Sequence, residues 1–199
     1  MDKIAAGPEG KGVISLDKSP TENLLALADA KGKRVHDMTV VLLDRPRHEH
    51  IIKELRNAGA RVSLITDGDV NPTVAVGLDD TGIDLYLGIG GAPEGVLGAA
   101  ALKCLGGEYQ GRLKFADEGE RERAIAMGIE KPDDILQLDD IVRGDCLFAA
   151  TGVTRGPLLA AAKVQGDRVR LNSIGLRSDT RTVRFFETWT HTEHLPVDE

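Results

Sequence analysis

The 199-residue chain contains few cysteines, few aromatic residues and no long apolar run. Its two cysteines, Cys104 and Cys146, lack a CxxC spacing, which argues against a zinc ribbon or a disulfide scaffold. Two buried thiols in a reducing compartment are the simpler interpretation. No stretch approaches the roughly 20 apolar residues that span a bilayer, and the N-terminus lacks the apolar segment of a signal peptide. The sequence therefore predicts a cytoplasmic protein with no membrane partner.

An excess of positive charge is also missing. The chain has 25 Lys and Arg residues against 32 Asp and Glu residues, which gives a formal net charge of −7. This balance argues against nucleic acid as a partner, and an anionic ligand would need a local group of Arg or Lys side chains. The share of hydrophobic residues, 41%, is sufficient for a core. Because no linker, repeat or low-complexity tract divides the sequence, we predict one α/β domain over residues 1–199.

Apolar segments alternate with amphipathic segments along most of the chain. Ser19 and Glu22 form a capping-box pattern, which predicts a helix from about residue 20 to residue 30, ended by Gly32. Strands that alternate with helices through short loops are typical of crossover units. We therefore predict a mixed, largely parallel sheet with helices on both faces. The other predicted helices are 48–58, 96–105 and 118–127, and the predicted strands are 12–16, 40–43, 62–65, 83–87, 135–138 and 147–150.

The two ends of the chain give weaker signals. Residues 1–8 show neither a helix cap nor a full strand pattern. Towards the C-terminus, residues 168–176 and 182–190 flank a polar turn and predict an antiparallel hairpin. We expect the tail from His191 onward to be loose.

A glycine-rich loop, Gly88–Gly95, follows a predicted strand and precedes a predicted helix. Glycines allow a ligand to approach the backbone closely, and a helix N-terminus favours phosphate. Glu94 adds a carboxylate, which tolerates a nearby phosphate when a cation lies between them. A dinucleotide oxidoreductase is a weaker alternative, because Pro93 occupies the third glycine position of that fingerprint and no acidic residue closes a second strand.

Two further loops follow predicted strands. One carries Arg45, Pro46 and Arg47, whose planar guanidinium groups suit phosphate, and the other carries Asp67, Gly68 and Asp69. Each loop alone is consistent with an ordinary polar turn. Because ligands gather at the carboxyl ends of parallel strands, the three loops together indicate a sugar-phosphate site.

Two neighbouring features are less specific. We expect His48 to be a solvated or capping residue rather than a general base, because it sits where a helix begins. The segment Thr151–Gly156 follows another predicted strand and is either a fourth wall of the site or an ordinary turn.

The order and spacing of four segments resemble those of class II fructose-1,6-bisphosphatases, including the cyanobacterial type that also hydrolyses sedoheptulose 1,7-bisphosphate. The segments are Asp44–Glu49, Thr66–Asp69, Gly88–Gly95 and Phe148–Gly152. The resemblance implies the inositol monophosphatase-like fold of metal-dependent sugar phosphatases. It also implies hydrolysis of the 1-phosphate of fructose 1,6-bisphosphate, in gluconeogenesis, glycerol metabolism or the Calvin cycle.

The resemblance assigns roles to individual residues. Arg45, Pro46 and Arg47 would hold the phosphate that is not hydrolysed, although many family members have Lys at the position of Arg45. Glu94 would be catalytic as a ligand of Mn²⁺ or Mg²⁺. The residues expected to contact the sugar are Asp67, Gly68, Asp69 and Gly91. Full-length family members are expected to be homo-oligomers.

One part of the family pattern is missing. The acidic motifs of the N-terminal, metal-binding half do not occur in this sequence. We therefore expect the chain to correspond to the C-terminal, sugar-phosphate-binding half and to be inactive alone, because one carboxylate cannot assemble a catalytic metal site. The alternative is a non-catalytic sugar-phosphate-binding or partner subunit.

Overall fold

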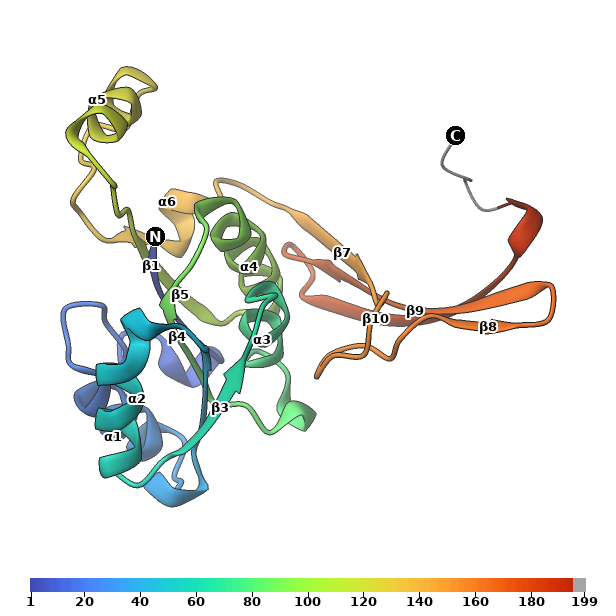
Figure 1. The fold of residues 1–199 in the computed structure, drawn as a ribbon, viewed down its shortest axis with the longest axis horizontal. Coiled ribbons are helices and arrows are strands. Elements are labelled where there is room, and N and C mark those ends of the chain that lie inside the picture. Colours follow the sequence, from blue (N-terminus) through green and yellow to red (C-terminus); the bar gives the residue numbers. More distant parts are fainter. Residues whose placement is uncertain (195–199) are drawn as a thin grey trace.

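A computed structural model describes residues 1–194, in which a six-stranded sheet lies between two layers of helices and a smaller sheet extends to one side (Figure 1). The strand order of the larger sheet is β3-β2-β4-β1-β5-β6. Its strands are β1 (Asp2–Ala6), β2 (Thr39–Leu43), β3 (Arg61–Ile65), β4 (Leu85–Ile89), β5 (Glu108–Arg112) and β6 (Leu136–Gln137).

Alternation of side chains along the strands builds a core on each face of this sheet. Ile4 and Leu87 face α1 (Pro20–Ala30) and α2 (Glu49–Asn57), where they join a cluster of buried aliphatic residues. On the opposite face, Ala5, Tyr86 and Tyr109 pack against α4 (Ala92–Leu105), beside α3 (Val70–Ala75). The prediction of helices on both faces is thus confirmed.

The prediction of a largely parallel sheet is wrong. Strand β2 pairs in parallel with β3 and β4, whereas β1 runs antiparallel to both β4 and β5, and β5 runs antiparallel to β6. The error arises because β1 and β5 were not foreseen. Strand β1 begins with two charged residues, Asp2 and Lys3, and the sequence Glu-Tyr-Gln-Gly-Arg of β5 is mostly polar. The strand predicted at 12–16 is also absent, since that segment forms turns after a short 3-10 helix, Pro8–Gly10.

Several predicted boundaries are confirmed. The Ser19–Glu22 capping box is formed at the start of α1, and Gly32 beyond its end has a φ of 61°. Strands β2 and β3 and helix α2 lie within two residues of their predicted bounds, as does α5 (Glu118–Ala126). Helix α4 begins four residues earlier than predicted, because Gly91 takes the N-cap position and Pro93 occupies the first turn.

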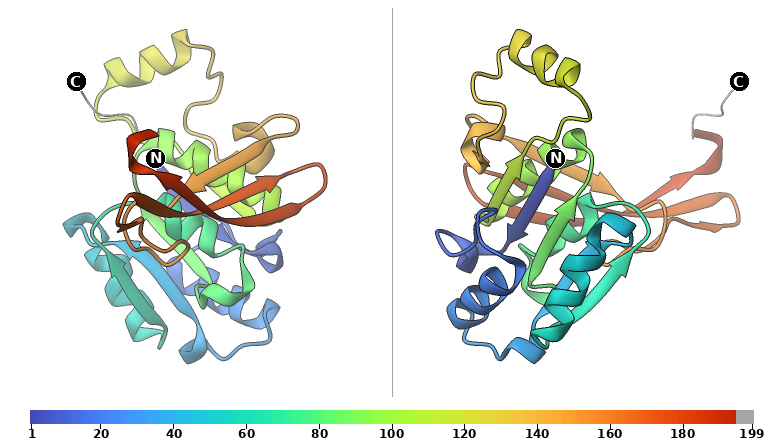
Figure 2. Two further views of the ribbon diagram at one scale, coloured as in Figure 1. Left: turned by 90° about the vertical axis from the view of Figure 1, so that its right-hand side faces the viewer. Right: turned by 60° about the vertical axis from the view of Figure 1, so that its left-hand side comes forward.

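The smaller sheet has the order β10-β9-β7, with β8 also paired to β9. Its strands are β7 (Leu147–Thr151), β8 (Lys163–Gln165), β9 (Arg168–Arg177) and β10 (Thr182–His191), and the predicted hairpin is β9–β10. Figure 2 shows the far end of this sheet projecting from the rest of the molecule. Near the larger sheet, Phe148, Ile174 and Leu176 share a core with the α4 residues Ala101 and Cys104.

The expectation of a loose tail is wrong for its first residues. His191 ends β10, and Thr192–His194 forms a 3-10 turn, whereas residues 195–199 lie outside the described part of the chain. The remaining short helices are Val35–Asp37, Pro46–His48, Asp79–Thr81 and α6 (Leu138–Ile141). Within residues 1–194, no helix has both the length and the apolar composition needed to cross a bilayer.

Candidate functional site

Three loops leave the same edge of the larger sheet. Because β2, β3 and β4 are parallel neighbours, the loops after Leu43, Ile65 and Ile89 emerge together at their carboxyl ends. Strand β1 runs the opposite way, so its first residues reach that edge too. The topology therefore gathers all eight residues assigned from the sequence at one edge: Arg45, Pro46, Arg47, Asp67, Gly68, Asp69, Gly91 and Glu94.

The loop after β2 presents its two arginines differently. Pro46 starts a 3-10 turn, Pro46–His48, that leads directly into α2. The exposed Arg47 donates from Nη2 to the carbonyl oxygen of Ile89 at 2.7 Å, which ties this loop to the end of β4. The half-buried Arg45 donates to the adjacent Asp44 carbonyl oxygen at 2.8 Å. Arg47 is thus held beside the glycine-rich loop and remains accessible to an anion.

His48 is buried, so the expectation of a solvated residue is wrong; it occupies the N-cap position of α2, as the alternative expected, but its side chain makes no capping hydrogen bond. Its Nδ1 lies 2.8 Å from the Leu43 carbonyl oxygen, and the Ile89 amide donates to Nε2 at 2.8 Å. These contacts fit a neutral ring that donates through Nδ1. Burial lowers the pKa of His48 below its usual value, which favours the same neutral form. The residue joins β2 to β4 and has no ring nitrogen left for catalysis.

Three glycines of the glycine-rich loop lie so close to neighbouring side chains that a larger residue would clash. Gly88 has a φ of 152°, and a side chain there would meet the His48 ring. A side chain at Gly91 would meet the Glu94 carboxylate, and one at Gly90 would meet the Asp69 carboxylate. Glu94 is exposed in the first turn of α4, and within residues 1–194 it has no hydrogen-bond or ion-pair partner. Its carboxylate is therefore available to bind a ligand at this helix N-terminus.

Asp67 and Asp69 occupy different environments. Asp67 is exposed and accepts a hydrogen bond from the Gly68 amide at 2.9 Å. Asp69 is buried, and its Oδ2 accepts from Lys3 Nζ at 2.6 Å and from the Tyr86 hydroxyl at 3.1 Å. Burial and the neighbouring Asp69 raise the pKa of Tyr86, so its hydroxyl stays protonated and donates. Asp69 anchors its loop beneath Gly90, and its predicted contact with sugar stays a prediction.

Lys3 is the participant that sequence reasoning missed. Its side chain is 1% exposed, and it belongs to a strand that was not recognised. The 66 residues that separate it from Asp69 offer no local spacing to detect. The one available signal was a lysine directly before the apolar run Ile4–Ala6, since a lysine buried beside such a run requires a partner.

A fourth loop also approaches this edge. Gly156 lies against the side chain of Asn71, which is in the first turn of α3, directly after Asp69. The segment Thr151–Gly156 therefore reaches from β7 back to the loop after β3, which supports the fourth-wall interpretation over an ordinary turn.

The residues at this edge do not make a complete cation site. Glu94 and Asp67 supply hard oxygen donors, but the described residues 1–194 contain no group of three His, Cys, Asp or Glu side chains placed to hold a metal ion. Mn²⁺ or Mg²⁺ takes about six oxygen ligands. Bound at this edge by the described residues, either ion would have at most one or two protein carboxylates.

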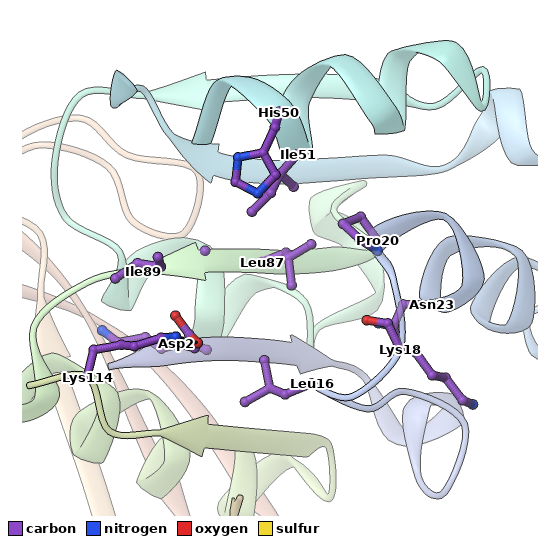
Figure 3. Close-up of a pocket in the computed structure, with 12 residues that line it drawn as sticks. Asp2, Leu16, Lys18, Pro20, Asn23, His50, Ile51, Leu87, Ile89 and Lys114 are labelled. Carbon is purple, nitrogen blue, oxygen red and sulfur yellow. Dashed lines mark hydrogen bonds and ion pairs between the residues drawn. The ribbon is translucent and has the colours of Figure 1, made fainter. Parts of the chain in front are cut away.

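A cavity of about 350 Å³ opens beside the site, on the α1–α2 face of the sheet (Figure 3). Leu87 and Ile89 of β4 form its floor, with Asp2 and Lys114 at one end and Lys18 at the other. None of the eight assigned residues lines it. The assigned residues thus lie at the sheet edge, separate from this hollow, and all are exposed except the half-buried Arg45 and the buried Asp69.

Comparison with known proteins gives a consistent family match. The chain matches the family described as "Bacterial fructose-1,6-bisphosphatase, glpX-encoded" over residues 1–190. It is 41% identical to the D-fructose 1,6-bisphosphatase class 2/sedoheptulose 1,7-bisphosphatase of Synechocystis sp., across 98% of this chain and 60% of that protein. The protein of the same name from Synechococcus elongatus is 42% identical across 94% of this chain and 58% of that protein. The chain therefore spans about 60% of the length of these relatives.

Proposed function

The chain belongs to the class II, glpX-encoded fructose-1,6-bisphosphatase family of phosphoric monoester hydrolases, and on this premise we propose that it provides the sugar-phosphate-binding half of a bisphosphatase. The proposed reaction of the whole enzyme removes the 1-phosphate of fructose 1,6-bisphosphate and leaves fructose 6-phosphate. Sedoheptulose 1,7-bisphosphate is the second proposed substrate. The proposed setting is cytoplasmic sugar metabolism, in gluconeogenesis or the Calvin cycle, with assembly as a homo-oligomer.

The observation that carries this proposal is the meeting of an arginine loop and a glycine-rich helix start at one sheet edge. Arg47 is hydrogen-bonded to Ile89, two residues before Gly91 at the N-cap of α4. A guanidinium group and a helix N-terminus both favour phosphate. A sugar with a phosphate at each end could therefore reach both groups.

The proposed roles follow from the exposure of each residue. Arg47 holds the phosphate that is not hydrolysed, together with Arg45 and Pro46 of the same loop. Asp67, Gly68 and the backbone at Gly91 contact the sugar hydroxyls. Asp69 is assigned to the same sugar-binding loop, which its buried contacts with Lys3 and Tyr86 fix in place.

Glu94 is proposed to donate one ligand to Mn²⁺ or Mg²⁺, a cation that lowers the pKa of bound water and neutralises phosphate charge. Because the described residues do not complete such a site, the other ligands must come from outside them. We therefore expect the chain alone to release no phosphate from fructose 1,6-bisphosphate. The experiment is a phosphate-release assay with Mn²⁺, run with the chain alone and after addition of the part of the Synechocystis relative that this chain does not match.

Substitution of Glu94 tests its role in the complemented enzyme. If Glu94 holds the cation, Glu94→Gln lowers turnover about a hundredfold or more at saturating Mn²⁺, because a neutral amide is a poor ligand for a hard cation. Glu118→Gln, in the first turn of the exposed helix α5, is the matched control and leaves turnover unchanged. Near-normal turnover of Glu94→Gln, with an unchanged melting temperature, would leave Glu94 as a helix-start residue only.

The lack of a three-ligand metal cluster in the described residues favours a second candidate, a non-catalytic sugar-phosphate-binding or partner subunit. The same assay separates the two proposals. Phosphate release after complementation supports the bisphosphatase half. Binding of fructose 6-phosphate without phosphate release under either condition supports the partner subunit.

A further inference from the structure

The two cysteines lie side by side although 42 residues separate them. Cys104 is in the last turn of α4, and Cys146 immediately precedes β7. Their Sγ atoms are 3.8 Å apart. Each sulfur also lies 3.6 Å from a carbonyl oxygen of the opposing segment, that of Cys146 for Cys104 and that of Ala100 for Cys146. The two thiols therefore point at each other across the junction between the larger sheet and the smaller one.

We propose that Cys104 and Cys146 are a covalent modification site, at which exchange with a disulfide compound forms a reversible intramolecular disulfide. The sulfurs are already in van der Waals contact, so closing the bond to about 2.05 Å needs a side-chain rotation and a small backbone shift. The bond would join α4, which has Gly91 at its N-cap and Glu94 in its first turn, to the first strand of the smaller sheet.

The different burial of the two thiols sets the order of events. Cys104 is fully buried, and burial raises its pKa to about 12, so it remains a protonated thiol. Cys146 is only half-buried and is the accessible partner.

The Cys146 thiolate attacks one sulfur of the oxidant disulfide and expels the first thiol. Cys104 then gives up its proton to solvent and attacks Cys146 Sγ, which expels the second sulfur as a thiolate; each expelled thiolate takes a proton from solvent, so the two protons of the protein thiols end on the two released thiols. Two protein thiols are oxidised to one disulfide while one disulfide is reduced to two thiols.

The test is incubation of the purified protein with oxidised glutathione, followed by alkylation of free thiols and mass spectrometry of the intact chain. We expect a loss of two hydrogen masses, no alkylated cysteine and no retained glutathione, with a Cys104–Cys146 linked peptide after digestion. Dithiothreitol should restore two alkylatable thiols. A wild-type chain that keeps two free thiols, or that retains glutathione on Cys146, would overturn the proposal.

Single substitutions provide an independent check on the order of attack. Cys104→Ser should accumulate the glutathione adduct on Cys146, because the second thiol is missing. Cys146→Ser should take up glutathione at least tenfold more slowly, because Cys104 is buried. Equal uptake by the two variants would contradict the proposed order. If a serine disturbs folding, the corresponding alanine variants retain the comparison.

Discussion

At the scale of single residues, the loops of the candidate site are held in place by buried polar contacts of His48 and of the Lys3–Asp69 pair. His48 connects the ends of β2 and β4, and the Lys3–Asp69 pair connects β1 to the loop after β3. Both are long-range pairings, so neither has a sequence spacing that could reveal it. The exposed residues Arg47, Asp67 and Glu94 could be proposed as site residues from the sequence because each lies in a short local motif.

Stability should depend on pH through His48. Burial lowers the pKa of His48 in the folded state, so the neutral ring contributes its full stability above the unfolded pKa of about 6.5. That contribution is lost as the pH falls through the lower pKa of the folded state, at up to about 1.4 kcal/mol per pH unit. Urea unfolding between pH 8 and pH 5 should show this loss in the wild type and in the exposed control His50→Gln, and less of it in His48→Phe.

At pH 8, His48→Phe should lower the free energy of unfolding by about 1–3 kcal/mol, because the Ile89 amide and the Leu43 carbonyl lose a partner. An identical pH dependence of stability in the wild type and in His48→Phe would show that the buried ring does not titrate between the folded and unfolded states.

Removal of Lys3 should be more damaging than removal of an exposed charge. Lys3→Met leaves the buried Asp69 carboxylate without its cation and should lower the free energy of unfolding by about 3–5 kcal/mol. Because Lys3→Met/Asp69→Leu removes both charges, it should be more stable than the sum of the single changes indicates. Chemical denaturation of the three variants measures this coupling, and strictly additive losses would mean that the pair does not interact.

At the scale of elements, local signals located most of the helices and strands but missed the short helices α3 and α6 and the strands β1, β5 and β8. Capping residues and helix-ending glycines gave α1 and α2 nearly correct bounds. Strands β1 and β5 were missed because their stability comes from pairing with each other over about a hundred residues of sequence and from the cover of α4. Their antiparallel direction, and hence the mixed sheet, could not be deduced from residue pattern alone.

Two directly paired residues of the smaller sheet provide a test at this scale. Ile174 of β9 and Phe185 of β10 face each other in register, but Ile174 is 0% exposed beneath α4 and Phe185 is 62% exposed. Ile174→Ala should lower the free energy of unfolding by about 2–5 kcal/mol, whereas Phe185→Ala should cost less than about 1 kcal/mol. Equal losses, measured by urea unfolding, would contradict the position of α4 over β9.

At the scale of the whole molecule, we propose that the chain folds as one α/β domain. Helix α4 contributes Ala99 and Leu102 to the core of the larger sheet and Ala101 and Cys104 to that of the smaller one. The candidate site is an open edge with few partners for its exposed charges. This openness is consistent with a chain that covers about 60% of its relatives, and it explains why the sequence predicted the ligand class more fully than the catalytic chemistry.

The central claim is that Arg47 and the glycine-rich loop bind a sugar phosphate, and calorimetric titration of the chain with fructose 6-phosphate tests it without requiring catalysis. We predict binding that Arg47→Ala weakens about tenfold to a hundredfold, as expected for the loss of a charge-assisted contact. Arg56→Ala, at the opposite end of α2, should leave the affinity unchanged. Equal affinities of the wild type and Arg47→Ala would contradict the account. Equal weakening by Arg47→Ala and Arg56→Ala would also contradict it, because the loss of one positive charge anywhere on the chain would then explain the effect.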